Sequence, residues 1–308
     1  MIMKILVMGG TRFVGKSLVE KFLSKKIKVD IFTRGNKQIP IGANFIKGDR
    51  NELKDIKQIS NNNYDYIFDI SGRELKQTKL LINNFNTSFN RYIYVSSAGV
   101  YKGINEIPLL ETDPIDKESR HIGKFETEDW LIKENIPFTS FRPTYIYGPN
   151  NYNKIENWFF ERLINEKKIP IPGDGLLLTQ LGHVSDLTDV MIKAIESEKA
   201  KNQIYNCSGE KGVTIKGLIY KCADVCNIKI NDIDLCPFDY KKLDPKSRKA
   251  FPLRLTHYLT SIDKVKSDLN WKPKFDLFTG LKNSFDNDFK FKKNDYFDSD
   301  KDLSLFDS

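Results

Sequence analysis

A glycine-rich turn near the start of the chain restricts the fold more than any other feature of the sequence. Residues 8–15 read MGGTRFVG, and they separate a buried strand expected at 4–8 from an amphipathic helix that begins near Phe13. Gly9 would end the strand, Gly15 would let the helix pack closely on the sheet, and the first helical turn would offer unpaired N–H groups to an anion. This strand, turn and helix predict a phosphate-binding Rossmann unit.

Strands and helices alternate through the first half, which predicts a doubly wound α/β fold with a parallel sheet of about seven strands. Further strands are expected at 28–32, 43–47, 64–70, 91–97 and 137–141, and helices at 52–59, 74–85, 123–135, 185–197 and 214–227. The pattern becomes less regular after Gly148. We expect a Rossmann dinucleotide-binding domain at 1–150, a smaller mixed C-terminal lobe at 151–288 with segments returning to the sheet, and a disordered tail at 289–308.

Composition limits the class of protein. No stretch approaches the roughly 18 apolar residues that a membrane helix needs, and the first strand leaves no room for a targeting segment, so we expect a cytoplasmic protein without a membrane partner. The four cysteines lack paired C-x-x-C spacing, so they do not indicate a metal site. The net charge of +8 fits a nucleic-acid partner. Abundant lysine, asparagine and isoleucine, as in proteins of A+T-rich genomes, explain it equally well.

Arg12 stands where a G-x-x-G-x-x-G turn has its middle glycine. Its side chain either blocks the close approach of a pyrophosphate or lies along the phosphates and contacts them. The second strand ends in Thr33 and Arg34, where an acid would hold the ribose 2′-hydroxyl of NAD. The two arginines therefore favour NADP over NAD, unless both are solvated loop residues.

Later motifs resemble the extended short-chain dehydrogenase/reductase family, the NAD-dependent sugar-nucleotide epimerases and dehydratases. They are GDRNEL from Gly48, VSSAGVY from Val95, RPTYIYGP from Arg142, LGHVSDLTDVM from Leu181 and LNWKPKFDLFTGL from Leu269. The resemblance implies that Asp49 meets the adenine and that Ser97 holds the catalytic serine position. It also implies a cofactor cleft formed by Gly9, Thr11, Arg12, Phe13, Val14, Gly15, Thr33, Arg34, Asp49, Arg50, Ser71, Ser97, Lys124 and Pro143.

Family members that transfer hydride pair a tyrosine with a lysine four residues later. GKFETE identifies the lysine as Lys124, and four residues before it stands Arg120. Arginine stays protonated and cannot act as the acid or base. His121 is titratable, but one step along a helix should turn its side chain about 100° away from that position. Ser97 and Lys124 are retained, but ordinary epimerase or dehydratase chemistry is not expected without the tyrosine.

The strings GGTRFVG, GDRNEL, SGRELKQT, SRHIGKFETE, WFFERL and TQLGHV resemble a narrower group, the chloroplast stem-loop RNA-binding proteins and their cyanobacterial relatives. That group shares the arginine in the first turn and the lost tyrosine. The resemblance implies RNA binding, a divalent-metal-dependent endonuclease activity, a role in transcript or ribosome maintenance, and an oligomer with itself or a paralogue. The absent transit peptide favours a cyanobacterial cytoplasm.

Basic residues in the C-terminal half are the candidate RNA contacts. They are Lys241, Lys242, Lys246, Arg248, Lys249 and Arg254, with Lys47, Arg50 and Lys102 as further cations and Tyr240, Phe251 and Tyr258 for base stacking. A solvated loop over the cofactor cleft explains the same run. A nuclease would need carboxylates around a metal, and Asp49, Asp69 and Asp116 are candidates by position only, so the metal ligands are unknown.

Two other functions agree with the same residues. An NADP-dependent reductase, epimerase or dehydratase could use Tyr145 or Tyr147 as a displaced base. A nucleotide-binding structural protein would keep the cleft and turn nothing over.

Overall fold

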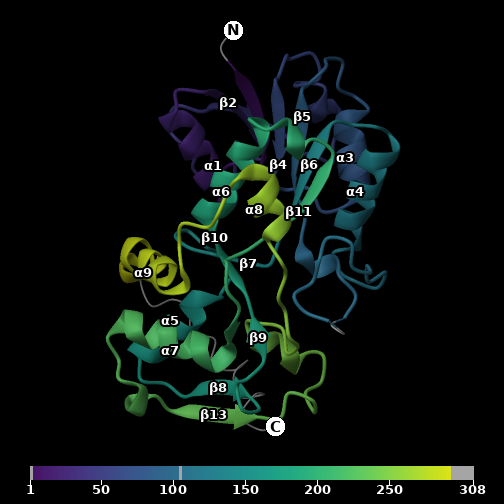
Figure 1. Ribbon diagram of the computed structural model, residues 1–308. Helices are drawn as coiled ribbons and strands as arrows, with labels where there is room; N and C mark the ends of the chain where they lie inside the picture. Colours follow the sequence, from purple (N-terminus) through teal and green to yellow (C-terminus); the bar gives the residue numbers. More distant parts are fainter. Residues whose placement is uncertain (1–2, 104–105, 293–308) are drawn as a thin grey trace.

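Seven parallel strands form the central sheet of the computed structural model, which describes residues 3–103 and 106–292 (Figure 1). They are β1 (Lys4–Met8), β2 (Lys28–Thr33), β3 (Asn44–Lys47), β4 (Tyr66–Asp69), β5 (Arg91–Val95), β6 (Phe138–Pro143) and β11 (Gln203–Cys207). Their order is β11-β6-β5-β4-β1-β2-β3, and every neighbouring pair is parallel. The predicted fold class is confirmed. The strand order reverses at β1, so a crevice is expected at its carboxyl end.

Helices cover both faces of this sheet (Figure 1). One face carries α1 (Phe13–Ser24), α6 (Val184–Ile195) and α8 (Asp263–Leu269), and the other carries α2 (Leu53–Ile56), α3 (Leu75–Ile82) and α4 (Ile122–Lys133). Side chains of β1 alternate between the two cores, since Ile5 and Val7 join α1 and α6 whereas Leu6 and Met8 join the opposite cluster. A strand buried on both faces explains the continuous apolar run that marked it in the sequence.

The turn between β1 and α1 depends on glycine at three positions. Gly9 and Gly10 have φ of 116° and 93°, a region that other residues rarely adopt. A Cβ on Gly15 would lie 2.6 Å from the backbone nitrogen of Gly10. The predicted strand-turn-helix junction is therefore present, and its helix begins as close to the strand as the backbone allows.

A smaller lobe lies beyond the carboxyl edge of the sheet (Figure 1). It contains α5 (Glu156–Ile164), α7 (Ile215–Cys226), α9 (Leu277–Asn287) and the strand pairs β7 (Tyr145–Tyr147) with β10 (Leu181–His183), β8 (Ile169–Pro172) with β13 (Leu235–Phe238), and β9 (Leu178–Thr179) with β12 (Val213–Thr214). Phe159, Phe160 and Ile219 are among its fully buried core residues. β11 comes from the same half of the chain but lies at the edge of the central sheet.

Five short 3-10 turns complete the described chain. They are η1 (Ala98–Val100), η2 (Glu198–Ala200), η3 (Ile230–Asp232), η4 (Ser247–Ala250) and η5 (Phe289–Phe291). The last begins the tail that was expected to be disordered from residue 289, and Phe289 is buried against the smaller lobe. Residues 293–308 of that tail lie outside the described residues.

Candidate functional site

The predicted cofactor residues lie around one edge of the central sheet. Gly9, Thr11, Arg12, Phe13, Val14 and Gly15 form the turn after β1 and the start of α1, Thr33 and Arg34 end β2, Asp49 and Arg50 follow β3, Ser71 follows β4, Ser97 follows β5, Pro143 ends β6, and Lys124 is on α4. Because all these strands are parallel, their carboxyl ends meet at the same crevice. No side chain caps the first turn of α1, so its N–H groups remain for an anion.

Arg12 takes a position that neither interpretation of the sequence anticipated. Its backbone is extended, with φ of −137° and ψ of 144°, so the missing glycine is not needed for the turn conformation. Its guanidinium lies 3.8 Å from the ring centroid of Tyr152, which belongs to the loop between β7 and α5. The ring of Phe13 meets the same tyrosine edge to face. Arg12 therefore links the glycine-rich turn to the smaller lobe through a cation–π contact.

Arg34 and Asp49 stand together at the ends of β2 and β3. The Asp49 carboxylate accepts hydrogen bonds from the backbone and side-chain nitrogens of Asn51, at 2.9 and 2.7 Å. These bonds lower the pKa of Asp49, and the charge of Arg34 acts in the same direction. Arg34 is exposed and forms no salt bridge with any residue in 3–103 or 106–292. Its charge is available to a phosphate beside β2.

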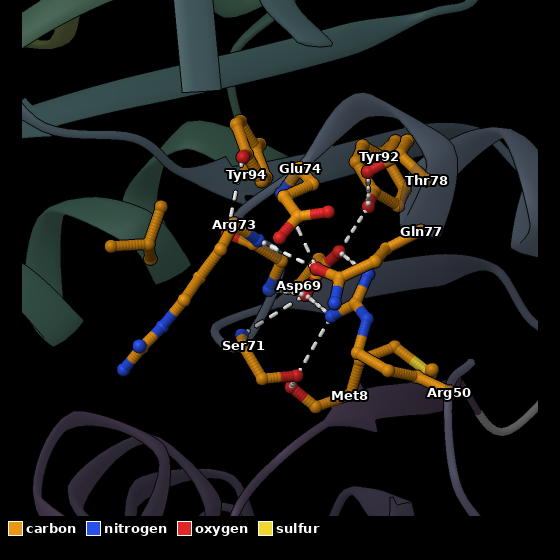
Figure 2. A network of polar contacts seen from close by, with 12 residues as sticks. Met8, Arg50, Asp69, Ser71, Arg73, Glu74, Gln77, Thr78, Tyr92 and Tyr94 are labelled. Carbon is orange, nitrogen blue, oxygen red and sulfur yellow. Dashed lines mark hydrogen bonds and ion pairs between the residues drawn. The ribbon is translucent and has the colours of Figure 1, made fainter. Parts of the chain in front are cut away.

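Arg50 and Asp69 form a buried ion pair at the centre of the polar network in Figure 2. The two terminal nitrogens of Arg50 donate to the two carboxylate oxygens of Asp69 at 2.6 and 2.7 Å, and the Tyr92 hydroxyl donates to the same carboxylate. The Asp69 side chain is fully buried, and that of Arg50 is only 11% exposed. This geometry contradicts two predictions: Asp69 is no metal ligand, and Arg50 is not free to contact RNA or cofactor phosphates.

The same network fixes the segment after β4. Backbone N–H groups of Ser71 and Gly72 donate to Asp69 at 3.0 and 2.8 Å. The carbonyl of Gly72 then accepts a hydrogen bond from Lys124 Nζ at 3.1 Å, and Val95 O accepts a second one at 2.6 Å. Burial lowers the pKa of Lys124 to about 8. The ion pair thus positions the segment that holds Lys124, whereas the side chain of Arg73 points away from the network in Figure 2.

His121 packs beside the segment after β5, and the helical rotation that was predicted to turn its side chain away does not apply to it. The helix α4 begins at Ile122, so His121 is its N-cap and the spacing of 100° per residue does not apply. Its ring packs against Gly99, where a Cβ would lie 2.5 Å from His121 Cδ2. Arg120 Nε donates to His121 Nε2 at 3.1 Å, so the arginine that was predicted to replace the tyrosine contacts this histidine directly.

Four cations lie near enough to His121 to affect its pKa, and we call them the cationic cluster. They are Arg73, Arg120, Lys124 and Arg254. Burial lowers the pKa of His121 to about 4, and all four cations act in the same direction. None of the three arginines forms a salt bridge within the described part of the chain. Unpaired positive charge around a neutral histidine is suited to binding an anion.

The two tyrosines proposed as a displaced base do not have the environment of one. The Tyr145 hydroxyl accepts a hydrogen bond from the backbone nitrogen of Arg254 at 2.7 Å, and burial raises the pKa of Tyr145. Tyr147 is buried, its hydroxyl is 3.4 Å from Asp276 O, and burial raises the pKa of Tyr147 as well. A base near neutral pH needs the opposite shift.

The side chain of Ser97, at the predicted serine position, accepts a hydrogen bond through Oγ from Gly99 N at 3.0 Å.

The basic residues predicted to contact RNA divide into two groups. Lys241, Lys242, Lys246, Arg248 and Lys249 are exposed on the segment 241–249, which we call the basic loop. It runs from β13 into η4, and Lys242 also pairs with Asp239 at 3.3 Å. Arg254 is half-buried and belongs to the cationic cluster, where its Nη2 would lie 3.0 Å from a Cβ on Gly99.

The aromatic and acidic predictions for an RNA site need correction. Phe251 and Tyr258 are each only 4% exposed, so they cannot offer a free face to a base at the surface, whereas Tyr240 is half-buried. Asp116 accepts a hydrogen bond from Glu118 N. Within residues 3–103 and 106–292 no three histidine, cysteine, aspartate or glutamate side chains are grouped to hold a metal.

Sequence reasoning overlooked Arg73 and Tyr152. Arg73 follows β4 within a few residues, so the rule that parallel strands end at one edge could have added it to the crevice. No comparable signal exists for Tyr152, because its contact with Arg12 joins segments 140 residues apart in the sequence.

About two thirds of the chain matches the model of a described family. Residues 5–208 match the model of the "NAD dependent epimerase/dehydratase family". The chain therefore belongs to this family, as the resemblance predicted. Within it, the chain is 40% identical over 302 residues to the chloroplast stem-loop binding protein of 41 kDa b of Arabidopsis thaliana, covering 93% of this chain and 79% of the relative. This relative confirms the narrower resemblance.

More distant relatives are sugar-nucleotide enzymes. A putative UDP-glucose 4-epimerase of Methanocaldococcus jannaschii is 25% identical over 309 residues, covering 90% of this chain and 96% of that protein. The crystal structure of UDP-glucuronic acid 4-epimerase from Bacillus cereus, in complex with UDP-glucuronic acid and NAD, has a TM-score of 0.76 and 18% identity, covering 94% of this chain and 100% of that one. At this identity the likeness establishes the fold.

Location and assembly stay predictions. No helix in the described part of the chain is long and apolar enough to cross a membrane. The Arabidopsis relative is named as chloroplastic, which does not test the expected cyanobacterial cytoplasm.

Proposed function

We propose that this protein binds stem-loop RNA and keeps a nucleotide cleft, without the hydride-transfer chemistry found in dehydrogenases of its fold. The observation that carries the proposal is Arg120. It stands four residues before Lys124, where the resemblance implies the catalytic tyrosine, and its Nε donates to His121 Nε2 at 3.1 Å. Like Arg73 and Arg254, it forms no salt bridge within the described residues. An arginine at this position cannot move a proton, but it can attract an anion.

Several features of the nucleotide cleft support a dinucleotide as its ligand. Gly15 packs directly on the backbone of Gly10, which holds the turn close to α1, and the uncapped first turn of α1 suits a pyrophosphate. A bound NADP would supply a nicotinamide for redox chemistry. The unpaired charge of Arg34 supports NADP over NAD, because a 2′-phosphate would meet it at the end of β2. Lys124 Nζ has one donor left after its bonds to Gly72 and Val95, and we assign that donor to the ribose.

Two groups of cations support RNA as the partner. The basic loop supplies five exposed side chains, and the cationic cluster supplies further charge in the crevice. A phosphate backbone is the ligand that draws most affinity from such charges. The Arabidopsis relative is named as a stem-loop binding protein, which supports a stem-loop as the form of the RNA. We propose binding alone, since the described acidic residues do not support the endonuclease.

A reductase or epimerase is the weaker candidate. It would need Tyr145 or Tyr147 as a base, and burial moves the pKa of each in the wrong direction. A ribosomal partner and an oligomer remain predictions from the resemblance.

Binding of a labelled stem-loop RNA by three proteins tests the proposal. Substitution of Lys241, Lys242, Lys246, Arg248 and Lys249 by glutamine should weaken binding strongly relative to the wild type. Arg12→Gly is the matched control, because Arg12 lies at the nucleotide turn, and it should leave the affinity nearly unchanged. Loss of binding in Arg12→Gly with no effect of the loop substitutions would mean that the nucleotide cleft is itself the RNA site.

A further inference from the structure

A cavity of about 390 Å³ lies between the basic loop and the cationic cluster. Ala98, Tyr101, Gly103, Leu109, Leu177, Tyr240, Arg254, Leu255, Thr256, His257 and Tyr258 line it. Its volume falls in the range of about 300 to 1,000 Å³ that is typical of small-ligand sites. No predicted cofactor residue lines it, so the cavity is separate from the glycine-rich turn.

The lining is suited to a flat aromatic ring. Tyr240, which is half-buried, offers the ring for stacking, and the nearly buried Tyr101 and Tyr258 contribute apolar contact together with three leucines. Tyr258 is held edge to face against Tyr145, with ring centroids 5.4 Å apart, so this wall is rigid. A nucleobase is a flat ring that stacks on aromatic side chains whatever its identity.

Polar groups stand at the open side of the same cavity. Thr256 and His257 are exposed there. The Nδ1 atom of His257 accepts a hydrogen bond from Leu178 N at 3.0 Å, so the ring proton lies on Nε2, which can donate to a base edge. Hydrogen bonds of this kind complement the stacking of an unpaired base.

Positive charge continues across the mouth of the cavity. Tyr240 directly precedes the first lysine of the basic loop, and Arg254 belongs to the cationic cluster. The Arg254 guanidinium lies 4.5 Å from the ring centroid of Tyr258, so one side chain reaches both a cavity wall and the cluster. A strand that passes from the basic loop to the cluster must cross the cavity.

We propose that this cavity receives one unpaired base from the loop of the bound RNA, while Arg254 and Arg120 contact the adjoining phosphate. The inference rests on the proposed RNA binding. It names the part of a stem-loop that the protein recognises: the unpaired nucleotides, whose bases are free to leave the stack, rather than the paired stem.

The test compares two RNAs that share one stem and one loop length. The first has a loop with all its bases, and the second has abasic nucleotides in the loop. The full chain should bind the abasic RNA about 5- to 150-fold more weakly, which is the range for one stacked base. Thr256→Trp, which fills the mouth of the cavity, should bind both RNAs equally, at the level of the abasic RNA on the wild type.

Two further variants complete the design. Tyr240→Ala removes one stacking wall and should also reduce the difference between the RNAs. Asn231→Trp places the same large residue on η3, which does not line the cavity, and should keep the full difference. Thermal melting of all variants monitors the fold.

The outcomes separate this inference from the proposed function. Equal binding of both RNAs by the wild type overturns the inference and leaves RNA binding intact. No binding of either RNA overturns both. A third outcome would also overturn the inference: UMP or UDP-glucose binds the wild type and not Thr256→Trp, while the affinity for both RNAs is the same in the two proteins. The cavity would then be a site for free nucleotides.

Discussion

Removal of the negative charge from Asp69 should destabilise the protein strongly. The Asp69→Asn side chain has the same size, but it leaves the guanidinium of Arg50 buried without a counter-charge, since Arg50 is 11% exposed and directs both terminal nitrogens at this carboxylate. Breaking a buried pair in this way costs about 3–5 kcal/mol of the free energy of unfolding. With an unfolding entropy of about 2.1 cal/mol/K per residue, the melting temperature should fall by roughly 5–8 °C.

Urea unfolding followed by circular dichroism measures this cost, and Asp129→Asn is the matched control. Asp129 pairs with Lys133 on the surface of α4, where both side chains are well exposed, so its loss should cost about 0.3–0.5 kcal/mol. Burial raises the pKa of Asp69, but Arg50 outweighs it, so the pKa lies below its usual value. The stabilisation is therefore complete at neutral pH and disappears only in acid. A loss below about 1 kcal/mol for Asp69→Asn would refute the reasoning on buried pairs.

Three further experiments test individual parts of the site. Arg34→Asp should reverse the preference of the cleft for NADP over NAD in isothermal titration, and an unchanged affinity ratio would show that Arg34 does not meet the 2′-phosphate. The wild type should transfer no hydride between NADP and UDP-glucose, whereas Arg120→Tyr restores the missing acid beside Lys124; rapid wild-type turnover would contradict the assignment of Arg120. Burial lowers the pKa of His121 to about 4, with help from the cationic cluster, so a bound phosphate should raise it in an NMR titration, and a constant pKa would place the anion elsewhere.

The pH dependence of stability follows from the same histidine. Its folded pKa lies below the usual value near 6.5, so the unfolded chain binds a proton more readily. The contribution of His121 is fully present above pH 6.5 and is lost as the pH falls toward 4. Replacement by asparagine should remove that part of the pH dependence.

The central sheet could be predicted because each of its early strands is a short apolar run followed by a turn and a helix. Gly9 and Gly15 mark the first such junction, and the structure requires glycine at both. β11 lacked a recognised signal, and the paired strands β9 and β12 have only two residues each. Elements that short show no periodicity, so tertiary packing decides them.

The sequence predicted which residues lie at the carboxyl edge of the sheet, but not which side chains contact one another there. Arg12, Arg34 and Arg50 were all expected at the carboxyl end of the sheet, and all three lie there. Which cation is buried against an acid depends on the packing beneath it, and only Arg50 faces a carboxylate that the sheet buries. The prediction for His121 assumed that residues 120 and 121 are already helical. Because α4 begins at Ile122, the direction of this side chain depends on a helix boundary, which sequence patterns locate only to within one or two residues.

The dependence of stem-loop affinity on salt tests the central claim most directly. Each phosphate that a cation neutralises contributes about 0.7–0.9 to the slope of log K against log salt concentration. We predict a steep slope for the wild type between 50 and 200 mM salt, and a clearly flatter one when the five cations of the basic loop are glutamine. A wild-type affinity that does not change with salt, or a slope that the substitutions leave intact, would contradict RNA binding through these charges.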